Sequence, residues 1–262
     1  MSTSLKERMS SYEDTSNYKL LNKLPLVIVI NGRNFNKVTS LLEKPYSSEL
    51  SEVFQSTMLR LCTEIDGCIF SYHYNDEIVF IAKNDQSIDT LPWYDNKLQK
   101  INSIATSIAT HHFTSYSSVM DINFFSDPIF YTSVFTLPNI QETVNFLIYK
   151  QQQNFIISMN NACYYGLNKN YSDNEIKNML SNLTLEEKSE LLKTKCNIDF
   201  YDYSVSYKRG VAAYRIPKLT ENLLKNKWAI NTNLPIFSKE QNFLFHIIKN
   251  GYDVLRKEHF ED

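Results

Sequence analysis

The chain has 262 residues, enough to bury a sizeable hydrophobic core as one large domain or as a domain with an appendage. Its 43% hydrophobic and 21% charged content is ordinary for a globular protein. Its net charge of −2 gives no bulk electrostatic case for binding nucleic acid, so any RNA contact would come from a local basic patch.

The sequence also bears on the compartment. No apolar run approaches the roughly 20 residues that a helix needs to cross a bilayer, so we expect no membrane association. The first residues contain acids and lack an apolar core, which argues against a secretory or transit peptide. The four cysteines show no CxxC spacing, and we expect reduced thiols rather than a zinc site or disulfides. These features together predict a cytoplasmic protein.

The first half of the chain alternates between strand and helix patterns. Residues 1–20 are polar, and we expect one or two helical turns there. Residues 24–31, LPLVIVIN, are predicted to form a buried strand because proline and glycine bound a continuous apolar run. The segment 47–66 has apolar residues at helical spacing after Ser47, which predicts an amphipathic helix that ends at Gly67.

A hairpin and a second helix follow. Two β-rich arms over 68–83 flank Asn75 and Asp76, which predicts a tight turn between two strands. Apolar residues at helical spacing predict a helix over 93–113. Residues 119–137 contain two strand-like pieces that a proline separates.

The second half is mainly helical. A third helix is predicted over 139–165, and one or two short helices over 171–195, each opened by a hydroxyl side chain suited to capping. Residues 210–218 are predicted to form a short strand. The tail from 221 to 262 is polar, and we expect it to be partly helical.

This order of elements predicts an α+β fold. It is a ferredoxin-like βαββαβ polymerase-palm core with extra helices and a short C-terminal strand. We place the palm-like domain at 21–220, between the polar segment 1–20 and the tail 221–262. Polymerase palms and nucleotide cyclases hold two divalent cations where the first strand ends beside the hairpin. The fold alone specifies no function, because it hosts many unrelated ones.

Four motifs occur in order along the predicted domain: INGRNF at 30–35, LEKPYSSEL at 42–50, GCIFSYHYNDEIVF at 67–80 and PWYDNKLQKINSIATSIATHHF at 92–113. In order and spacing they resemble the tRNA-His guanylyltransferase family and its 3′→5′ RNA polymerase relatives. The motifs NACYYGL at 161–167 and SYKRGVAAY at 206–214 extend the resemblance to the end of the domain.

The resemblance implies that nucleotides are added to the 5′ end of tRNA or tRNA-like RNA in the 3′→5′ direction. The implied substrate is GTP or another nucleoside triphosphate, and the implied cofactor is a pair of Mg²⁺ ions. Such chemistry uses one cation to activate the attacking oxygen and the other to neutralise triphosphate charge. The resemblance also implies a homo-oligomer, by analogy a tetramer.

The family's two metal-binding acids fall at positions 31 and 76. Asp76 keeps its carboxylate, but Asn31 offers only an uncharged carbonyl oxygen, and hard cations are held largely by charge. We expect a metal site at Asp76, Asn31 and Ile30 that binds more weakly than the family's site. The resemblance marks Asp76 and Glu77 as catalytic. Successive strand residues face opposite sides, so we expect Asp76 as the ligand and Glu77 in a supporting role. Without the flanking motifs, Asn75 and Asp76 would simply form a turn.

The resemblance also implies a nucleotide site. It places the triphosphate against the backbone of Gly32, Arg33, Asn34 and Phe35, where glycine allows close approach. Side-chain contacts are implied for Lys44, Asn75 and Asn161. Taken alone, Lys44 would be a solvated loop lysine and Asn161 an ordinary polar helix residue.

Candidate RNA contacts are the basic residues of the later motifs, namely Lys97, Lys100, Lys150, Lys208 and Arg209. The commoner role of lysines on the wet face of a helix, or of paired basic residues at a turn, is simply to be solvated. Both readings stay open on the sequence.

The chain departs from the family pattern at several positions. Val29 replaces an arginine, and an F-D-x-R pattern becomes FYTS at 130–133. An R-Q-x-D pattern becomes KQQQ at 150–153, and apolar residues occupy 155–157. Specificity for tRNA-His therefore does not carry over. These accompanying changes favour natural divergence at Asn31 over an engineered replacement of aspartate.

Three functions stay open on the sequence. The first is a 3′→5′ nucleotidyltransferase acting on RNA. The second is a catalytically impaired member that binds RNA or nucleotide, or that supports an active paralogue in a mixed oligomer. The third is a cyclase-like palm enzyme acting on free nucleotides, against which the helix motif at 93–107 argues.

Overall fold

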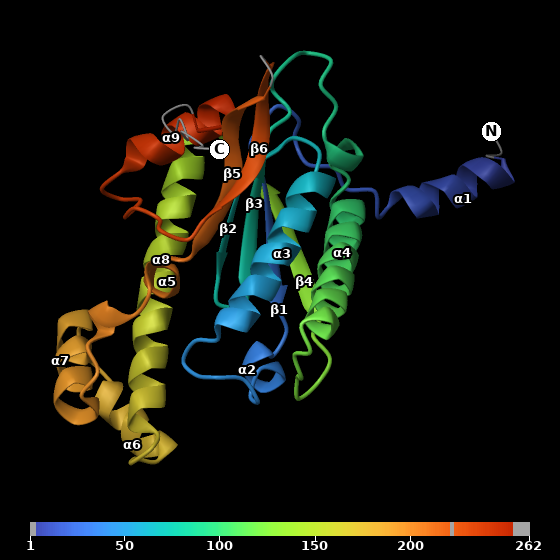
Figure 1. Ribbon diagram of the computed structural model, residues 1–262. Coiled ribbons are helices and arrows are strands. Elements are labelled where there is room, and N and C mark those ends of the chain that lie inside the picture. The colour runs from blue at the N-terminus through green and yellow to red at the C-terminus, as the bar shows by residue number, and fades with distance from the viewer. Residues whose placement is uncertain (1–3, 221–222, 254–262) are drawn as a thin grey trace.

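The computed structural model describes residues 4–220 and 223–253, and Figure 1 shows its arrangement. The expectations for residues 1–3, 221–222 and 254–262 lie outside the described residues. The helices are α1 (Leu5–Asp14), α2 (Phe35–Val38), α3 (Ser48–Glu64), α4 (Leu98–Val119), α5 (Ile140–Leu167), α6 (Asp173–Leu180), α7 (Leu185–Cys196), α8 (Val205–Arg209) and α9 (Gln241–Asn250), with short 3-10 helices η1 (Trp93–Asn96) and η2 (Phe200–Asp202). The strands are β1 (Leu26–Gly32), β2 (Cys68–Tyr74), β3 (Glu77–Ala82), β4 (Phe130–Thr136), β5 (Val211–Thr220) and β6 (Leu223–Asn231). No helix among the described residues is long and apolar enough to cross a membrane.

The strands form one antiparallel sheet in the order β4-β1-β3-β2-β5-β6. The first four strands, with α3 and α4 between them, follow the predicted βαββαβ order and the strand arrangement of a ferredoxin-like core. The structure therefore confirms the α+β palm prediction. β5 and β6 extend the sheet beyond β2.

Helices cover both faces of the sheet. Successive strand residues point to opposite faces, so the neighbours Ile28 and Val29 of β1 lie in different cores. Ile28 packs into the core beneath α3 and α4, and Val29 into the core beneath α5 and α9. Figure 1 shows α3 and α4 on one side of the sheet and the long α5 on the other. The lower half of α5 carries the α6–α7 lobe.

The tail contributes more structure than the sequence indicates. We expected one short strand and a polar tail, but β5 and β6 form a long hairpin. Leu244, Ile247 and Ile248 of α9 are fully buried against the sheet. The predicted boundary at 220 thus lies between two paired strands, and described residues of 223–253 pack in the same core.

The predicted second helix begins later than expected. Tyr94, Asp95 and Asn96 have left-handed backbone angles, so η1 is irregular and α4 starts at Leu98. The reason is a tertiary contact, because the buried Asn96 amide donates to the Leu21 carbonyl oxygen at 3.1 Å. The contact with the N-terminal segment thus stabilises this turn although the local sequence pattern favours a helix.

The two remaining differences concern α1 and the connection before β4. α1 has ten residues, more than the expected one or two turns, and none of them is buried. It projects from the body of the molecule in Figure 1. Only one strand, β4, occurs where two strand-like pieces were expected, because residues 120–129 form a loop.

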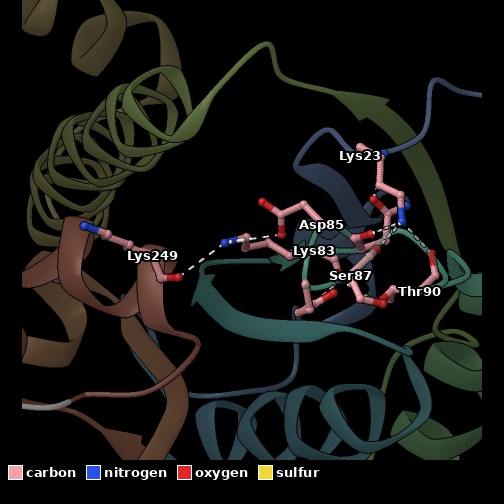
Figure 2. A network of polar contacts seen from close by, with 8 residues as sticks. Lys23, Lys83, Asp85, Ser87, Thr90 and Lys249 are labelled. Carbon is pink, nitrogen blue, oxygen red and sulfur yellow. Dashed lines mark hydrogen bonds and ion pairs between the residues drawn. The ribbon is translucent and has the colours of Figure 1, made fainter.

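A polar network fastens the loop after β3, and Figure 2 shows it. The Lys23 ammonium donates to the carbonyl oxygens of Asn84, Ser87 and Thr90 at 2.9, 2.8 and 2.9 Å. Lys83 pairs with Asp85 at 3.4 Å and reaches the Lys249 carbonyl oxygen of α9 at 3.3 Å. The network lies where β1 begins, at the opposite end of the sheet from the β2–β3 turn.

Candidate active site

The end of β1 meets the β2–β3 turn. Asn31 pairs with Glu77 of β3 on one side and with Tyr131 of β4 on the other. The next residue, Gly32, donates its backbone N–H to the Asp76 carbonyl oxygen at 2.8 Å. A Cβ atom at Gly32 would lie 2.2 Å from the Phe35 ring, so glycine is required for this close turn. The fold therefore brings together the two positions that the family motif marks as acids.

The carboxylate of Asp76 has no ion-pair partner among the described residues. Asn75 has a left-handed backbone, and its amide donates to the Asp76 Oδ1 atom at 2.7 Å. Burial, helped by the nearby Glu77 charge, raises the pKa of Asp76 to about 6. No basic side chain of the described residues lies within ion-pair distance of Asp76. A bound cation would therefore favour the ionised form of this group.

The negative charge of Glu77 is balanced by a basic side chain of the protein, Lys150. It shares a sheet face with Asn31 and is 9% exposed, and Lys150 of α5 reaches it across that face. The Lys150 ammonium donates to Oε2 at 2.8 Å and lies 2.6 Å from Oε1, which receives no hydrogen bond of good geometry. Tyr74 of β2 pairs with Glu77 across the hairpin, and burial together with the Glu77 charge raises the pKa of Tyr74. Glu77 and Lys150 thus form an ion pair, and the supporting role expected of Glu77 stays a prediction.

One cleft gathers four residues singled out in the sequence. Lys44, Asn75, Asp76 and Asn161 line a space of about 460 Å³, open to solvent, between the loop before α3, the hairpin turn and α5. The Lys44 ammonium donates to Thr39 Oγ1 at 2.9 Å and lies 5.8 Å from the centre of the Tyr165 ring. Partial burial lowers the pKa of Lys44. The cleft thus combines the half-buried ammonium of Lys44 with the carboxylates of Asp76 and Glu43. This set suits a ligand that carries phosphates and a cation.

The cleft continues along α2. Asn34 and Phe35 line the adjoining space together with Asn75 and Asp76. Phe35 contributes an anchor rather than a ligand group, because its ring packs in the core against Phe54, Phe113 and Phe130. Arg33 is exposed beside the cleft.

A deeper slot opens from the cleft and was missed by sequence reasoning. His73, Asn154 and Tyr207 line it, and it shares Asn75 and Asn161 with the cleft. Burial lowers the pKa of His73 to about 4, so its ring is neutral near pH 7. His73 Nδ1 lies 3.1 Å from the Glu77 carbonyl oxygen, which makes Nδ1 the donor and leaves Nε2 as an acceptor. Of the slot's lining, Asn75 and Asn161 are the two residues to which the resemblance assigned a role, and His73 and Tyr207 lie inside the same motifs without one.

The remaining sequence candidates lie elsewhere. Ile30 is fully buried within the sheet, paired with Ile78 and Thr132. Lys97 and Lys100 stand at the start of α4, at the end of the sheet opposite the cleft, where Lys100 lies 4.9 Å from the Tyr94 ring centre. Lys97 and Lys100 therefore lie away from Asp76. Ile30 lies two residues before Gly32, which bonds to Asp76, and its assignment as a metal ligand stays a prediction.

The basic pair of α8 also lies apart from Asp76. Lys208 donates to the Tyr201 carbonyl oxygen, and Arg209 donates to the Leu234 carbonyl oxygen at 3.0 Å. Both line a largely apolar groove along α5, beside Phe155. These contacts give the two cations local partners, and they leave a role in RNA binding untested.

Comparison with known proteins settles the family. A family model described as tRNAHis guanylyltransferase matches residues 6–138. This chain belongs to that family. The Dictyostelium discoideum protein named probable tRNA(His) guanylyltransferase is 23% identical over 220 residues, which are 79% of this chain and 83% of that protein. The tRNA(His) guanylyltransferase of Candida glabrata is 21% identical over 218 residues, 77% of this chain and 88% of that protein.

Solved structures agree with the family assignment. A bacterial tRNA(His) guanylyltransferase-like protein in complex with ATP superposes with a TM-score of 0.80 at 27% identity, covering 94% of this chain and 99% of that one. A bacterial tRNA(His) guanylyltransferase-like protein in complex with GTP gives 0.75 at 24% identity over 94% and 99%. The Saccharomyces cerevisiae tRNA(His) guanylyltransferase shares the fold, with a TM-score of 0.67 at 17% identity over 80% and 91%.

Proposed function

We propose that this chain adds nucleotides to the 5′ end of tRNA or tRNA-like RNA in the 3′→5′ direction, using a nucleoside triphosphate. The observation that carries the proposal is the single cleft lined by Lys44, Asn75, Asp76 and Asn161 at the end of β1, in a chain of this family. Solved relatives in complex with ATP and with GTP support a triphosphate as substrate and leave the base open.

The residues of the cleft divide the work. Lys44 supplies a positive charge to the phosphates, and the amides of Asn75 and Asn161 can donate hydrogen bonds to phosphate oxygens. The hydrogen bond between Gly32 and Asp76 fixes the end of β1 against the turn, so Asn75 and Asp76 are held in place before a ligand arrives. Asn34 and Phe35, two of the four residues expected to border the triphosphate, line the adjoining space.

The donor set fits a divalent cation, but one held with less charge than the family pattern provides. Asp76 offers a carboxylate without an ion-pair partner, and Asn31 stands on the neighbouring strand with an amide oxygen. Glu77 is neutralised by Lys150, and among the described residues no three acidic, histidine or cysteine side chains gather into a metal site. When bound, Mg²⁺ would neutralise triphosphate charge. Two ions, as in the resemblance, would need ligands from the triphosphate itself.

An extension assay tests the proposal. The protein is incubated with labelled nucleoside triphosphate, 5′-activated tRNA and either Mg²⁺ or Mn²⁺. We expect a product extended at its 5′ end, lost in Asp76→Ala and increased in Asn31→Asp. A matched control is Tyr12→Ala, which removes an exposed side chain of α1 far from the cleft. Absence of product from both the natural sequence and Asn31→Asp would refute the proposal.

A second candidate is a catalytically impaired member that binds RNA or nucleotide, or that supports an active paralogue. Asn31 and the Glu77–Lys150 pair favour it, because Asn31 offers no carboxylate and Lys150 engages that of Glu77. The acids that line the cleft are then Asp76 and Glu43. Co-purification with a paralogue that carries aspartate at the matching position would support it. Robust turnover by the natural sequence, abolished by Asp76→Ala, would exclude it.

Mass measurement in solution tests the tetramer that the family analogy suggests.

A further inference from the structure

A second surface adjoins the cleft on its β4 side and meets it at Lys37, which lines the space along α2 with Asp76. The proposed function assigns no role to the side chains of this surface. Three apolar side chains are exposed there, with Phe125 at 56%, Ile129 at 46% and Tyr131 at 54%. Two exposed cations, Arg33 and Lys37, accompany them. We call these five residues the β4 strip.

Backbone hydrogen bonds hold the strip in place. Arg33 donates its N–H to the Ile129 carbonyl oxygen at 2.7 Å, and Phe125 donates its N–H to the Val38 carbonyl oxygen at 2.9 Å. The Lys37 ammonium lies 5.4 Å from the centre of the Phe125 ring. The loop before β4 is thereby fastened to α2, and its exposed rings are presented at a fixed place.

The strip is continuous with the reacting end of β1. Tyr131 pairs with Asn31, so it shares the sheet face of Asn31 and Glu77. Lys44 and Asn161 border Asp76 from the direction of α3 and α5, whereas Tyr131 stands on the other side of β1, in the edge strand. Two substrates that meet at Asp76 would therefore contact different surfaces. One surface carries Lys44 and Asn161, and the other carries Tyr131.

The chemistry of the strip matches unpaired nucleotides. Exposed aromatic rings stack on bases irrespective of sequence, and neighbouring cations contact the connecting phosphates. The family pattern has an acid at position 131, and Tyr131 both removes that negative charge and adds a ring. Asp121 and Asp127 are exposed in the same loop and offset the two positive charges, so binding would depend mainly on the aromatic rings.

We infer that the β4 strip binds the unpaired nucleotides at the 5′ end of the RNA acceptor, with Tyr131 stacking on a base next to the reacting end. Arg33 and Lys37 contact the phosphates of the same nucleotides. The inference rests on the proposed function, because it assigns the acceptor of that reaction to one side of Asp76.

Fluorescence anisotropy of a fluorescein-labelled tRNA acceptor-stem mimic, with unpaired 5′ nucleotides or with a blunt end, tests the inference without turnover. We expect Tyr131→Ala to weaken binding of the first RNA about fivefold or more, since one stacked base contributes roughly 1–3 kcal/mol. Tyr131→Phe keeps the ring and should bind normally, as should the control Tyr12→Ala. Arg33→Ala with Lys37→Ala should reduce the salt dependence of binding. The blunt RNA should bind more weakly and be insensitive to Tyr131→Ala.

Several results would overturn the inference. Unchanged RNA affinity in Tyr131→Ala would do so, and so would a loss confined to nucleotide affinity, measured by calorimetry. A change of mass in Tyr131→Ala would instead mark the strip as an interface between copies. If Tyr131→Ala extends RNA with an unchanged KM for RNA, the inference fails while the proposed function stands. If neither the natural sequence nor Asn31→Asp binds RNA or forms product, both fail.

Discussion

At the scale of single residues, the site depends on which carboxylates remain free of protein cations. Asp76 is free, Glu77 is bound to Lys150, and position 31 carries an amide. The motif reading could place Asp76, Lys44 and Asn161 in one site because each lies in a local pattern. It did not single out His73 or Tyr165, although both lie inside the matched motifs. Thr39 and Asn154 lie outside them, and only the packing of distant elements brings them to the cleft and the slot.

Asn31→Asp should strengthen metal binding and weaken the metal-free fold. A carboxylate at position 31 would stand next to Glu77 on the neighbouring strand, so repulsion should lower Tm when no metal is present. Added charge should tighten Mn²⁺ binding by roughly tenfold, measured by calorimetry with nucleotide present. Asn17→Asp, at the far end of the sheet, adds the same charge as a control. Equal Mn²⁺ affinities in the natural sequence and Asn31→Asp would contradict this assignment.

Asp76 should make stability fall as pH rises. Burial raises the pKa of Asp76 to about 6, above its usual value near 3.8, so the folded state binds more protons between these values. Stability therefore falls between about pH 4 and 6, and the full loss, about 2–3 kcal/mol, persists at higher pH. Asp76→Asn should match the natural sequence at pH 4 and exceed it by that amount at pH 8. Urea unfolding of both proteins across this range checks the expectation, which parallel curves would contradict.

At the scale of elements, local patterns predicted what local chemistry determines. The helices α3, α6 and α7 follow apolar periodicity and side-chain caps, and the β2–β3 hairpin follows its turn. η1 and the late start of α4 escaped prediction because the contact of Asn96 with Leu21 joins segments far apart in the chain. β6 escaped because its pairing with β5 fixes it, and no strand alternation marks it in the sequence.

The Lys150–Glu77 pair is an element-scale link, since it joins α5 to β3. Lys150→Met should destabilise the protein by about 3 kcal/mol, because a buried carboxylate loses its partner. The double variant Lys150→Met with Glu77→Gln should recover much of that loss in urea unfolding. If Lys150 instead contacts RNA, the double variant would show a raised KM for RNA. Additive effects of the two substitutions would show that the pair does not couple.

Lys23 fastens the β3–η1 loop from outside it. Lys23→Met removes three hydrogen bonds to carbonyl oxygens and should lower the unfolding free energy by about 1–3 kcal/mol. Hydrogen exchange should increase in residues 84–90, measured by mass spectrometry. Lys6→Met changes an exposed lysine of α1 and should have no effect on either measurement. Unaltered exchange in the loop would show that the ammonium does not hold it.

At the scale of the whole molecule, α1 stands outside the common core. Deleting residues 1–14 should leave Tm unchanged, because none of the residues of α1 is buried in the folded chain. The segment after it keeps its own contact, since Lys19 pairs with Asp95. Calorimetry of the shortened protein checks this, and light scattering reports the mass. A fall in Tm accompanied by a fall in mass would show that α1 packs on another copy.

The long helix α5 has a mechanical consequence for the molecule. Its 28 residues span roughly 42 Å without a break. Along that one rod stand Lys150 at the sheet, Asn154 at the slot and Asn161 at the cleft, and its far end carries the α6–α7 lobe. Because α5 is one continuous helix, a force applied to the α6–α7 lobe would rotate or shift the whole helix. Such a movement of α5 would change the width of the cleft and the length of the Lys150–Glu77 ion pair together.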